Sequence, residues 1–273
     1  MEAKQAVAYA KNFLEKVSSE AESEAEILVA HLLNVSRGSL KYTSKQIEEK
    51  DLEPLLNRRL KDEPLQYILG KWGFYKGEFL VGEGVLIPRQ DTETLVETAV
   101  EFLKEKQNPR VIDLCSGSGC VAISIATDFP NAEVIACEKY EKAFSYLEKN
   151  ISYNNTKNVK PLLLDITKET LEAADLIVSN PPYITKKDME TLQKEVLKEP
   201  ETALYGGEDG LYFYRVIAEK WSPVLKKGGM LALEIGIGQE ESVKELLKAA
   251  GLKNIGTKKD LCGVQRVVFG TAE

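Results

Sequence analysis

The sequence contains one histidine, His31, and four cysteines that form no C-x-x-C pair. Ser-His-Asp and Cys-His mechanisms need a histidine beside the nucleophile, so a lone histidine makes that chemistry improbable. A zinc site needs ligands at matched spacing, which Cys115, Cys120, Cys137 and Cys262 do not provide. We therefore expect no metal site, and we interpret the cysteines as reduced, buried thiols.

Long apolar runs and an excess of positive charge are also missing. No stretch of about 18 apolar residues occurs, so the sequence predicts no membrane span. Residues 1–7 lack the basic-then-apolar pattern of a secretion signal, and we expect a cytoplasmic protein. The net charge of −7 opposes binding to a phosphate backbone, which favours a protein or small-molecule substrate with no direct nucleic-acid requirement.

The first part of the chain has the pattern of amphipathic helices. Apolar residues recur there at three- and four-residue spacing, which predicts helices over residues 9–17, 23–34 and 47–60. Ser23 and Glu26 have capping-box spacing, which predicts that the second helix begins there. Between Trp72 and Val85, aromatic and β-branched residues alternate with glycines and predict a short hairpin that connects two domains.

From Arg110 onward, short apolar runs alternate with helical patterns. The runs predict buried parallel strands at residues 110–114, 133–137, 159–164, 175–179 and 230–235. Helical patterns separate them, for example over residues 141–150 and 239–250. This alternation predicts a doubly wound α/β sheet with helices on both faces. A last pair of segments, around Gly256 and over residues 264–269, can close the sheet with an antiparallel strand.

A glycine-rich turn follows the first predicted strand, in Asp113-Leu114-Cys115-Ser116-Gly117-Ser118-Gly119-Cys120. Such a turn lets backbone approach a ligand at the carboxyl edge of the sheet. Gly117 to Ala122 also fits the G-x-G-x-x-A form of dinucleotide-binding turns. A purely structural tight turn is the alternative interpretation.

Single acids follow the next two strands. Glu138 is placed to accept hydrogen bonds from two ribose hydroxyls, although a solvated acid at the start of the next helix would look the same. Asp165 is placed either to meet an adenine amino group or to cap a helix predicted over residues 167–172. The sequence leaves both choices open.

The fourth strand ends in Asn180-Pro181-Pro182-Tyr183. Two successive prolines fix the backbone and remove two amide donors. The Asn180 side-chain oxygen and the Pro181 carbonyl then offer two acceptors for the two hydrogens of an NH2 group, and Tyr183 offers a flat face for a planar amide or base. Such a site orients a poorly nucleophilic nitrogen without a dedicated base. An ordinary Asn-Pro turn does not account for the whole tetrapeptide.

This tetrapeptide, together with the Gly117/Gly119 turn, resembles the class I methyltransferases that act on exocyclic or amide nitrogen. Other stretches are similar to the HemK/PrmC family, the peptide chain release factor glutamine N5-methyltransferases, and the similarity covers nearly the whole chain. They are Ile87-Pro88-Arg89-Gln90-Asp91-Thr92-Glu93, Glu199-Pro200-Glu201-Thr202-Ala203-Leu204, Gly206-Gly207-Glu208-Asp209-Gly210-Leu211 and Asp260-Leu261-Cys262-Gly263-Val264-Gln265-Arg266-Val267-Val268.

The resemblance implies a Rossmann-like class I fold with a mostly parallel seven-stranded sheet. It implies S-adenosylmethionine as cofactor, and the glutamine of the Gly-Gly-Gln loop of release factors as the methyl acceptor. The implied domains are a helical substrate-recognition domain (1–70), a hairpin connector (71–88) and a cofactor-binding catalytic domain (89–273). We expect a cytoplasmic monomer that needs no membrane.

The same resemblance implies roles for individual residues. The cofactor-binding set is Cys115, Ser116, Gly117, Ser118, Gly119, Glu138, Asp165, Ile166 and Asn180. Asn180, Pro181, Pro182 and Tyr183 would bind the glutamine, with Asn180, Pro181 and Tyr183 as the catalytic residues. Two positions depart from the family pattern: Cys115 replaces a glycine, and Gln90 replaces a proline.

Three other functions fit part of the pattern. A nucleic-acid methyltransferase for adenine N6 or guanine N2 would need the same acceptors, but a flipped base also calls for Lys and Arg clusters at the phosphates. A nicotinamide-dependent oxidoreductase explains Gly117, Gly119 and Glu138 but not the Asn180–Tyr183 segment. A non-catalytic docking module would keep the fold without needing an intact Asn180.

Overall fold

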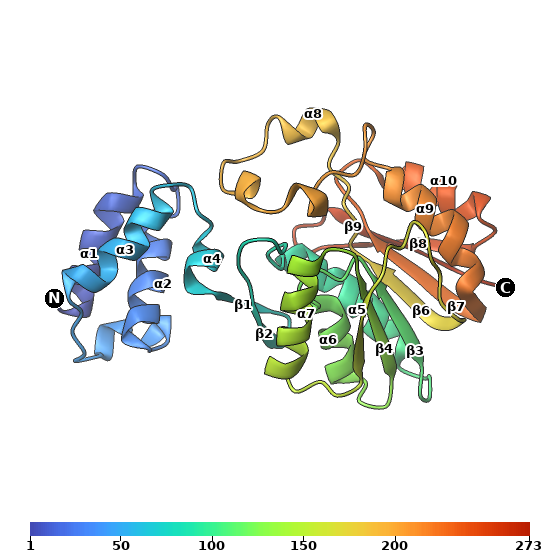
Figure 1. Cartoon of the computed structure of the whole chain (residues 1–273), viewed down its shortest axis with the longest axis horizontal. Coiled ribbons are helices and arrows are strands. Elements are labelled where there is room, and N and C mark those ends of the chain that lie inside the picture. The colour runs from blue at the N-terminus through green and yellow to red at the C-terminus, as the bar shows by residue number, and fades with distance from the viewer. The chain divides into compact units, whose positions relative to one another are not determined.

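The computed structural model describes residues 1–273 and divides the chain into two compact units (Figure 1). The first unit is Met1–Lys71 together with Gln193–Lys198, and the second is Trp72–Leu192 together with Glu199–Glu273. The sequence did not predict that residues 193–198 belong to the first unit. The domain limits drawn above, at residues 70 and 88, stay predictions.

The first unit is helical. It contains α1 (Ala3–Leu14), α2 (Ala21–Leu33), the 3-10 helix η1 (Arg37–Tyr42), α3 (Glu49–Arg59) and α4 (Leu65–Leu69). The predicted capping box at Ser23 is wrong, because α2 begins at Ala21 with Glu20 as its N-cap. Ala21 and Ala25 are both buried, and their packing extends the helix past the polar signal. The five residues of α4 are too few to show a helical period.

Arg59 joins the returning segment to these helices. Its side chain is buried, and it forms ion pairs with Glu24 at 2.8 Å and with Glu195 at 2.7 Å. Removing one partner of a buried pair leaves an uncompensated charge, so both carboxylates contribute to holding Arg59. Residues 193–198 are therefore attached to the first unit by charge.

The second unit contains a seven-stranded sheet in the order β5-β4-β3-β6-β7-β9-β8. Its strands are β3 (Arg110–Leu114), β4 (Glu133–Glu138), β5 (Val159–Leu163), β6 (Ala174–Ser179), β7 (Leu225–Glu234), β8 (Lys253–Lys259) and β9 (Gln265–Thr271). All neighbours pair in parallel except β9, which is antiparallel to both β7 and β8. The predicted strands and the antiparallel closing pair are confirmed, and so is the class I methyltransferase fold.

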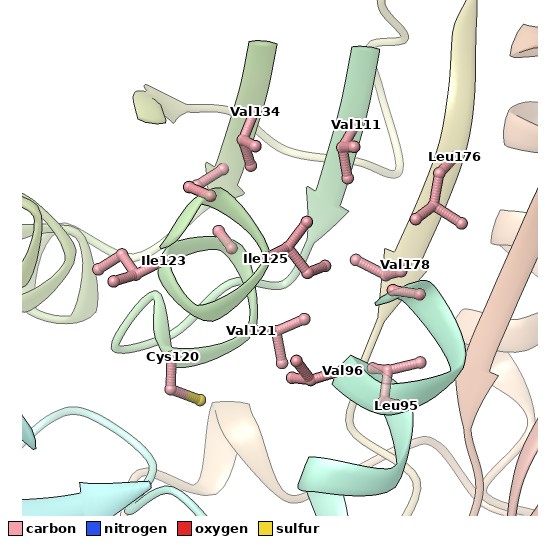
Figure 2. Packing of buried hydrophobic residues seen from close by; sticks show 14 of the residues in the cluster. Leu95, Val96, Val111, Cys120, Val121, Ile123, Ile125, Val134, Leu176 and Val178 are labelled. Atoms are coloured by element: carbon pink, nitrogen blue, oxygen red, sulfur yellow. The ribbon is translucent and has the colours of Figure 1, made fainter. Parts of the chain in front are cut away.

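Helices cover both faces of this sheet (Figure 1). One face carries α5 (Glu93–Leu103), α6 (Cys120–Asp128) and α7 (Glu141–Tyr153), and the other carries α9 (Tyr212–Trp221) and α10 (Glu240–Ala249). Figure 2 shows the first layer, in which α5 and α6 pack on the strands through Leu95, Val96, Val121, Ile125, Val111, Leu176 and Val178. Each such side chain contributes about 1.5–3 kcal/mol by leaving water, so the sheet is a rigid platform for the loops at its edge.

Short elements complete the fold. The predicted hairpin is present as β1 (Lys71–Phe74) and β2 (Gly77–Leu80), which pair only with each other. The remaining short helices are η2 (Gln90–Thr92), α8 (Lys186–Met189), η3 (Val196–Lys198, in the returning segment), η4 (Glu201–Ala203) and η5 (Ser222–Val224). No helix is both long enough and apolar enough to span a membrane.

The four cysteines are all free. Cys120 and Cys137 are buried as expected, and Cys115 is partly buried. The expectation is wrong for Cys262, which is exposed because it lies in the turn between β8 and β9. No group of three or more His, Cys, Asp or Glu side chains is arranged to hold a metal ion.

Asn150 ties the hairpin to the glycine-rich turn. The Asn150 side chain is fully buried on α7, where its Oδ1 accepts from the Leu80 N–H at 2.6 Å. Its Nδ2 donates to the Leu80 carbonyl at 3.1 Å and to the Ser118 carbonyl at 2.9 Å. One amide thus satisfies three backbone groups from two separate segments.

Replacing Asn150 with alanine should lower the free energy of unfolding by about 2–4 kcal/mol, because buried backbone groups lose their partners. Urea denaturation followed by circular dichroism measures the change. Asn131→Ala, at an exposed asparagine, is the matched control and should stay within about 0.5 kcal/mol of the parent. A loss below about 1 kcal/mol in Asn150→Ala would contradict this role.

Candidate active site

The carboxyl edge of the sheet has a crevice where the strand order reverses. Strand β3 pairs in parallel with β4 on one side and with β6 on the other, so the connections leave in opposite directions. A cavity of about 960 Å³, its open mouth included, lies at this point within the second unit. Ligands of open α/β sheets bind in the crevice at such a switch point.

The cavity brings together most of the residues predicted from the sequence. Its lining includes Cys115, Ser116, Gly117, Ser118, Glu138, Asp165, Ile166, Asn180 and Pro182. Three predicted residues are not in the lining: Gly119, Pro181 and Tyr183. The lining also contains residues that sequence reasoning did not select, among them Asp113 and Thr92.

The two glycines of the turn have different structural roles. Gly117 has φ +55°, and a Cβ built there would meet nothing within 4 Å, so its backbone faces open space. Gly119 has φ +81° and caps α6, and a Cβ there would lie 2.4 Å from Leu147 Cδ1. Gly119 is therefore needed for helix packing, and a substitution there would not test ligand contact alone.

Cys115 has φ +58°, the left-handed conformation that side chains rarely adopt. Glycine adopts this conformation without strain, which accounts for the glycine in the family pattern at this position. Burial raises the pKa of the Cys115 thiol well above its usual range, so the thiol stays protonated. The turn therefore tolerates a side chain at the cost of local strain.

Glu138 ends β4 with its carboxylate buried, at 6% exposure. Its Oε2 accepts from the Gly117 N–H at 2.9 Å, and its Oε1 accepts from the N–H groups of Lys139 and Tyr140 at 2.8 Å each. Burial raises the pKa of Glu138, while these backbone bonds lower it. A carboxylate has about four lone-pair sites, so one remains for a ligand. The solvated-acid interpretation is wrong.

Asp165 follows β5 and stabilises a turn. Its Oδ1 accepts from the Thr167 N–H at 3.0 Å and from the Thr167 hydroxyl at 2.7 Å, and Lys139 pairs with Oδ2 at 3.1 Å. Burial raises the pKa of Asp165, but these partners outweigh it and lower the pKa to about 2. The helix predicted over residues 167–172 is wrong, because Asp165 closes a short turn before β6.

Asp113, at the end of β3, was missed by the sequence analysis. Its carboxylate is buried, accepts from the Ala122 N–H at 3.2 Å and contributes to the cavity wall. Burial raises the pKa of Asp113 to about 7. The available signal was an acid in a buried strand directly before the glycine-rich turn. A carboxylate there suits a ligand ammonium group.

Three glycines pack closely against the Pro182–Tyr183 segment that follows Asn180. A Cβ at Gly206 would lie 2.6 Å from the Pro182 carbonyl oxygen, and one at Gly210 would lie 2.4 Å from the Tyr183 carbonyl oxygen. A Cβ at Gly236 would lie 3.0 Å from Tyr183 Cδ2. This close approach explains why residues 206–211 carry glycines.

Gln239, the N-cap residue of α10, holds the same backbone by hydrogen bonds. Its Nε2 donates to the carbonyls of Tyr183 at 3.1 Å and Gly210 at 3.3 Å, while its Oε1 accepts from the Gly236 N–H at 2.9 Å. The segment from Pro182 to Tyr183 is therefore fixed by packing and by hydrogen bonds. Nothing in the local sequence pattern singled out Gln239.

Two of the motifs that carried the resemblance, residues 87–93 and 199–204, contribute to the lining of this cavity. Glu199 accepts from the Ile87 N–H at 2.9 Å and pairs with Arg89. Arg266 pairs with Asp91 at 2.9 Å and with Asp260 at 3.2 Å. Residues 87–91 are thus held from two distant parts of the chain.

Gln90 is exposed at the start of η2, directly after Arg89, whose backbone is extended. An extended residue is what normally precedes proline, so this site is compatible with the proline of the family pattern. The neighbouring ion pairs of Arg89 and Asp91 hold the segment without it.

Comparison with known proteins agrees with this geometry. Residues 5–70 match the family model described as the PrmC N-terminal domain, and residues 90–218 match the methyltransferase small domain. The chain is 40% identical over 255 residues to the release factor glutamine methyltransferase of Thermodesulfovibrio yellowstonii, covering 90% of this chain and 91% of the relative. The corresponding protein of Geobacter sulfurreducens is 39% identical, with 94% and 91% covered.

The chain belongs to the release factor glutamine methyltransferase family. Among solved structures, the hMettl16 catalytic domain in complex with MAT2A 3′UTR hairpin 6 has a TM-score of 0.56 at 15% identity. It covers 70% of this chain and 73% of that one, which shows the common methyltransferase fold. Membership in this methyltransferase family excludes the oxidoreductase interpretation.

Replacing Glu138 with alanine should weaken S-adenosylmethionine binding by about 1–3 kcal/mol, the loss expected for a hydrogen bond to a charged group. Isothermal calorimetry measures the affinity. Glu141→Ala, at the exposed acid that begins α7, is the control and should bind as the parent does. Unchanged affinity in Glu138→Ala, or binding of NADH in place of S-adenosylmethionine, would contradict the assignment.

Proposed function

We propose that this protein transfers a methyl group from S-adenosylmethionine to the side-chain amide nitrogen, N5, of the glutamine in the Gly-Gly-Gln motif of peptide chain release factors. Family membership supports the reaction class. The observation that supports an NH2 group as the methyl acceptor is the Asn180 amide, which lines the cavity. Its Nδ2 donates to the Thr92 hydroxyl at 3.2 Å, which leaves Oδ1 as an acceptor for an NH2 group.

The cavity residues fit the methyl donor. Cys115, Ser116, Gly117 and Ser118 would hold its methionine end, where the open face of Gly117 gives room and Asp113 suits the ammonium group. Glu138 would hold the ribose with its remaining lone pair. Asp165 and Ile166 would lie beside the adenine. When bound, S-adenosylmethionine supplies an electrophilic methyl group on a positively charged sulfur.

The chain's own residues hold and orient the acceptor amide. Asn180 Oδ1 would accept one hydrogen of the glutamine NH2, and the Pro181 carbonyl would accept the other. An amide nitrogen is a weak nucleophile because its lone pair is delocalised, and holding both hydrogens favours localisation of that pair on nitrogen. The proton then leaves to water, and no dedicated base is required.

Pro181 and Tyr183 are the parts of this arrangement that do not line the cavity. Pro181 is buried, Tyr183 is half-buried, and neither is in the cavity lining. Burial raises the pKa of the Tyr183 phenol far above neutrality, so the ring remains neutral. The roles of the Pro181 carbonyl as an acceptor and of Tyr183 as a stacking face stay predictions.

Replacing Asn180 with alanine removes one preorganised acceptor and should lower turnover on a release factor by about 10²–10³. S-adenosylmethionine affinity should change much less, because Asn180 chiefly serves the methyl acceptor. Single-turnover methyl transfer, measured beside calorimetry, separates the two effects. The idea fails if turnover in the variant stays within threefold of the parent.

We also propose that the first unit recognises the body of the release factor. The cavity residues all belong to the second unit, so the helices of the first unit are not needed to build the chemical site. A function in the cytoplasm follows from a substrate that acts in translation. The protein is proposed to work as a monomer without nucleic acid.

This recognition model predicts a difference between a whole release factor and a short peptide that carries only its Gly-Gly-Gln loop. The KM for the peptide should be at least about tenfold higher, while kcat changes little, because the peptide reaches the chemical site without the additional contacts. Steady-state kinetics with the full-length enzyme measures both constants. Equal kcat/KM for peptide and whole factor would show that the first unit adds no recognition.

A further inference from the structure

Thr92, in the stretch Ile87–Glu93, is a buried polar side chain that contacts Asn180 and does not itself bind the substrate in the proposed chemistry. Thr92 ends η2 and is 2% exposed, yet it contributes to the cavity wall. Its hydroxyl lies 3.2 Å from Asn180 Nδ2. This hydrogen bond fixes which way the Asn180 amide is turned.

The direction of this hydrogen bond decides what the substrate meets. The two ends of an amide are nearly identical in shape, but only the oxygen accepts and only the nitrogen donates. A threonine hydroxyl can act in either sense. If Thr92 donated its proton to Asn180, it would occupy Oδ1, and the NH2 end would face the acceptor in its place.

Glu234 supplies the reason for the observed direction. It is the last residue of β7, is 1% exposed, and its Oε2 has no hydrogen-bond partner. The Thr92 hydroxyl is among the groups that lower the pKa of Glu234, so Glu234 is a neighbouring acceptor for its proton. An ionised carboxylate can only accept, so a Thr92 hydroxyl that turns its proton toward Glu234 has its oxygen free to accept from Asn180.

We propose that Thr92 and Glu234 are positioning residues that keep the Asn180 amide oxygen turned toward the methyl acceptor. The inference rests on the proposed function and adds a specificity device to it. In this orientation the NH2 group of the methyl acceptor faces the Asn180 oxygen, which can accept its hydrogen. In the opposite orientation it would face the Asn180 NH2 group, and the hydrogens of the two groups would repel each other.

If Glu234 acts on Asn180 through Thr92, the turnover number should depend on the protonation state of Glu234. Burial raises the pKa of Glu234 to about 7, against the hydrogen bonds of Thr92 and Tyr183 and the charge of Arg266, while Asp91 raises it further. Tyr214 on α9 and Cys120 on α6 also interact with the charge of Glu234, and both are neutral at this pH because burial raises their pKa. Protonated Glu234 can donate to Thr92, which then can donate to Asn180 Oδ1. The turnover number should therefore rise as pH increases through about 7.

The test compares full-length variants on a whole release factor with S-adenosylmethionine. Thr92→Val keeps the shape and removes the hydroxyl, so kcat should fall about 10- to 100-fold with cofactor affinity within twofold of the parent. Thr92→Ser restores the hydroxyl and should recover at least a third of the parent kcat. Thr98→Val is the matched control, because Thr98 is buried on α5 and its hydroxyl bonds only the Thr94 carbonyl at 2.8 Å. Its kcat should be unchanged.

Glu234→Gln provides a second arm if Thr92→Val does not fold. Glutamine can donate to Thr92 at every pH, so kcat should be low and should lose its rise near pH 7. The inference is overturned if the parent methylates the release factor while Thr92→Val keeps more than half of the parent kcat. It is also overturned if Glu234→Gln keeps the parent's pH profile. A parent enzyme that transfers no methyl to the release factor would refute the proposed function itself.

Discussion

In the proposed mechanism the Asn180 amide presents its oxygen to the cavity, and the rest of the site depends on that orientation. A side-chain amide can flip by 180° at little steric cost, so its orientation has to be held by hydrogen bonds. Thr92 binds its nitrogen end, and the prolines that follow remove the donors that would otherwise compete. The chemistry needs no strong base in this account, because it depends on two acceptors held in place before the substrate arrives.

Keeping those acceptors in place requires parts of the chain that are far apart in sequence. Parallel pairing of β3 with β4 and β6 brings the glycine-rich turn, Glu138 and Asn180 to one edge of the sheet. Gln239 and three glycines then fix the backbone after Asn180. The ion pairs of Arg89 and Arg266 hold the segment that carries Thr92. The rigid sheet sets the distances, and the loops supply the chemistry.

Local sequence patterns predicted the strands of the sheet and the glycine-rich turn. The strand at Arg110–Leu114 has the predicted bounds, and the turn that follows it lies in the cavity wall. The start of α2 and the absence of a helix after Asp165 could not be predicted, because burial of Ala21 and side-chain bonds to Thr167 decide them. Thr92, Glu234 and Gln239 gain their meaning only from tertiary contacts. Their positions in the sequence gave no periodic or spacing signal.

The most direct test of the account is the site of methylation on a release factor. Mass spectrometry of a factor treated with this enzyme and S-adenosylmethionine should find a single methyl group, on the glutamine nitrogen of the Gly-Gly-Gln motif. A factor with glutamate in place of that glutamine should take up none, because a carboxylate has no NH2 for Asn180 to hold. Methylation of the glutamate variant, or transfer only to DNA or RNA, would contradict the account.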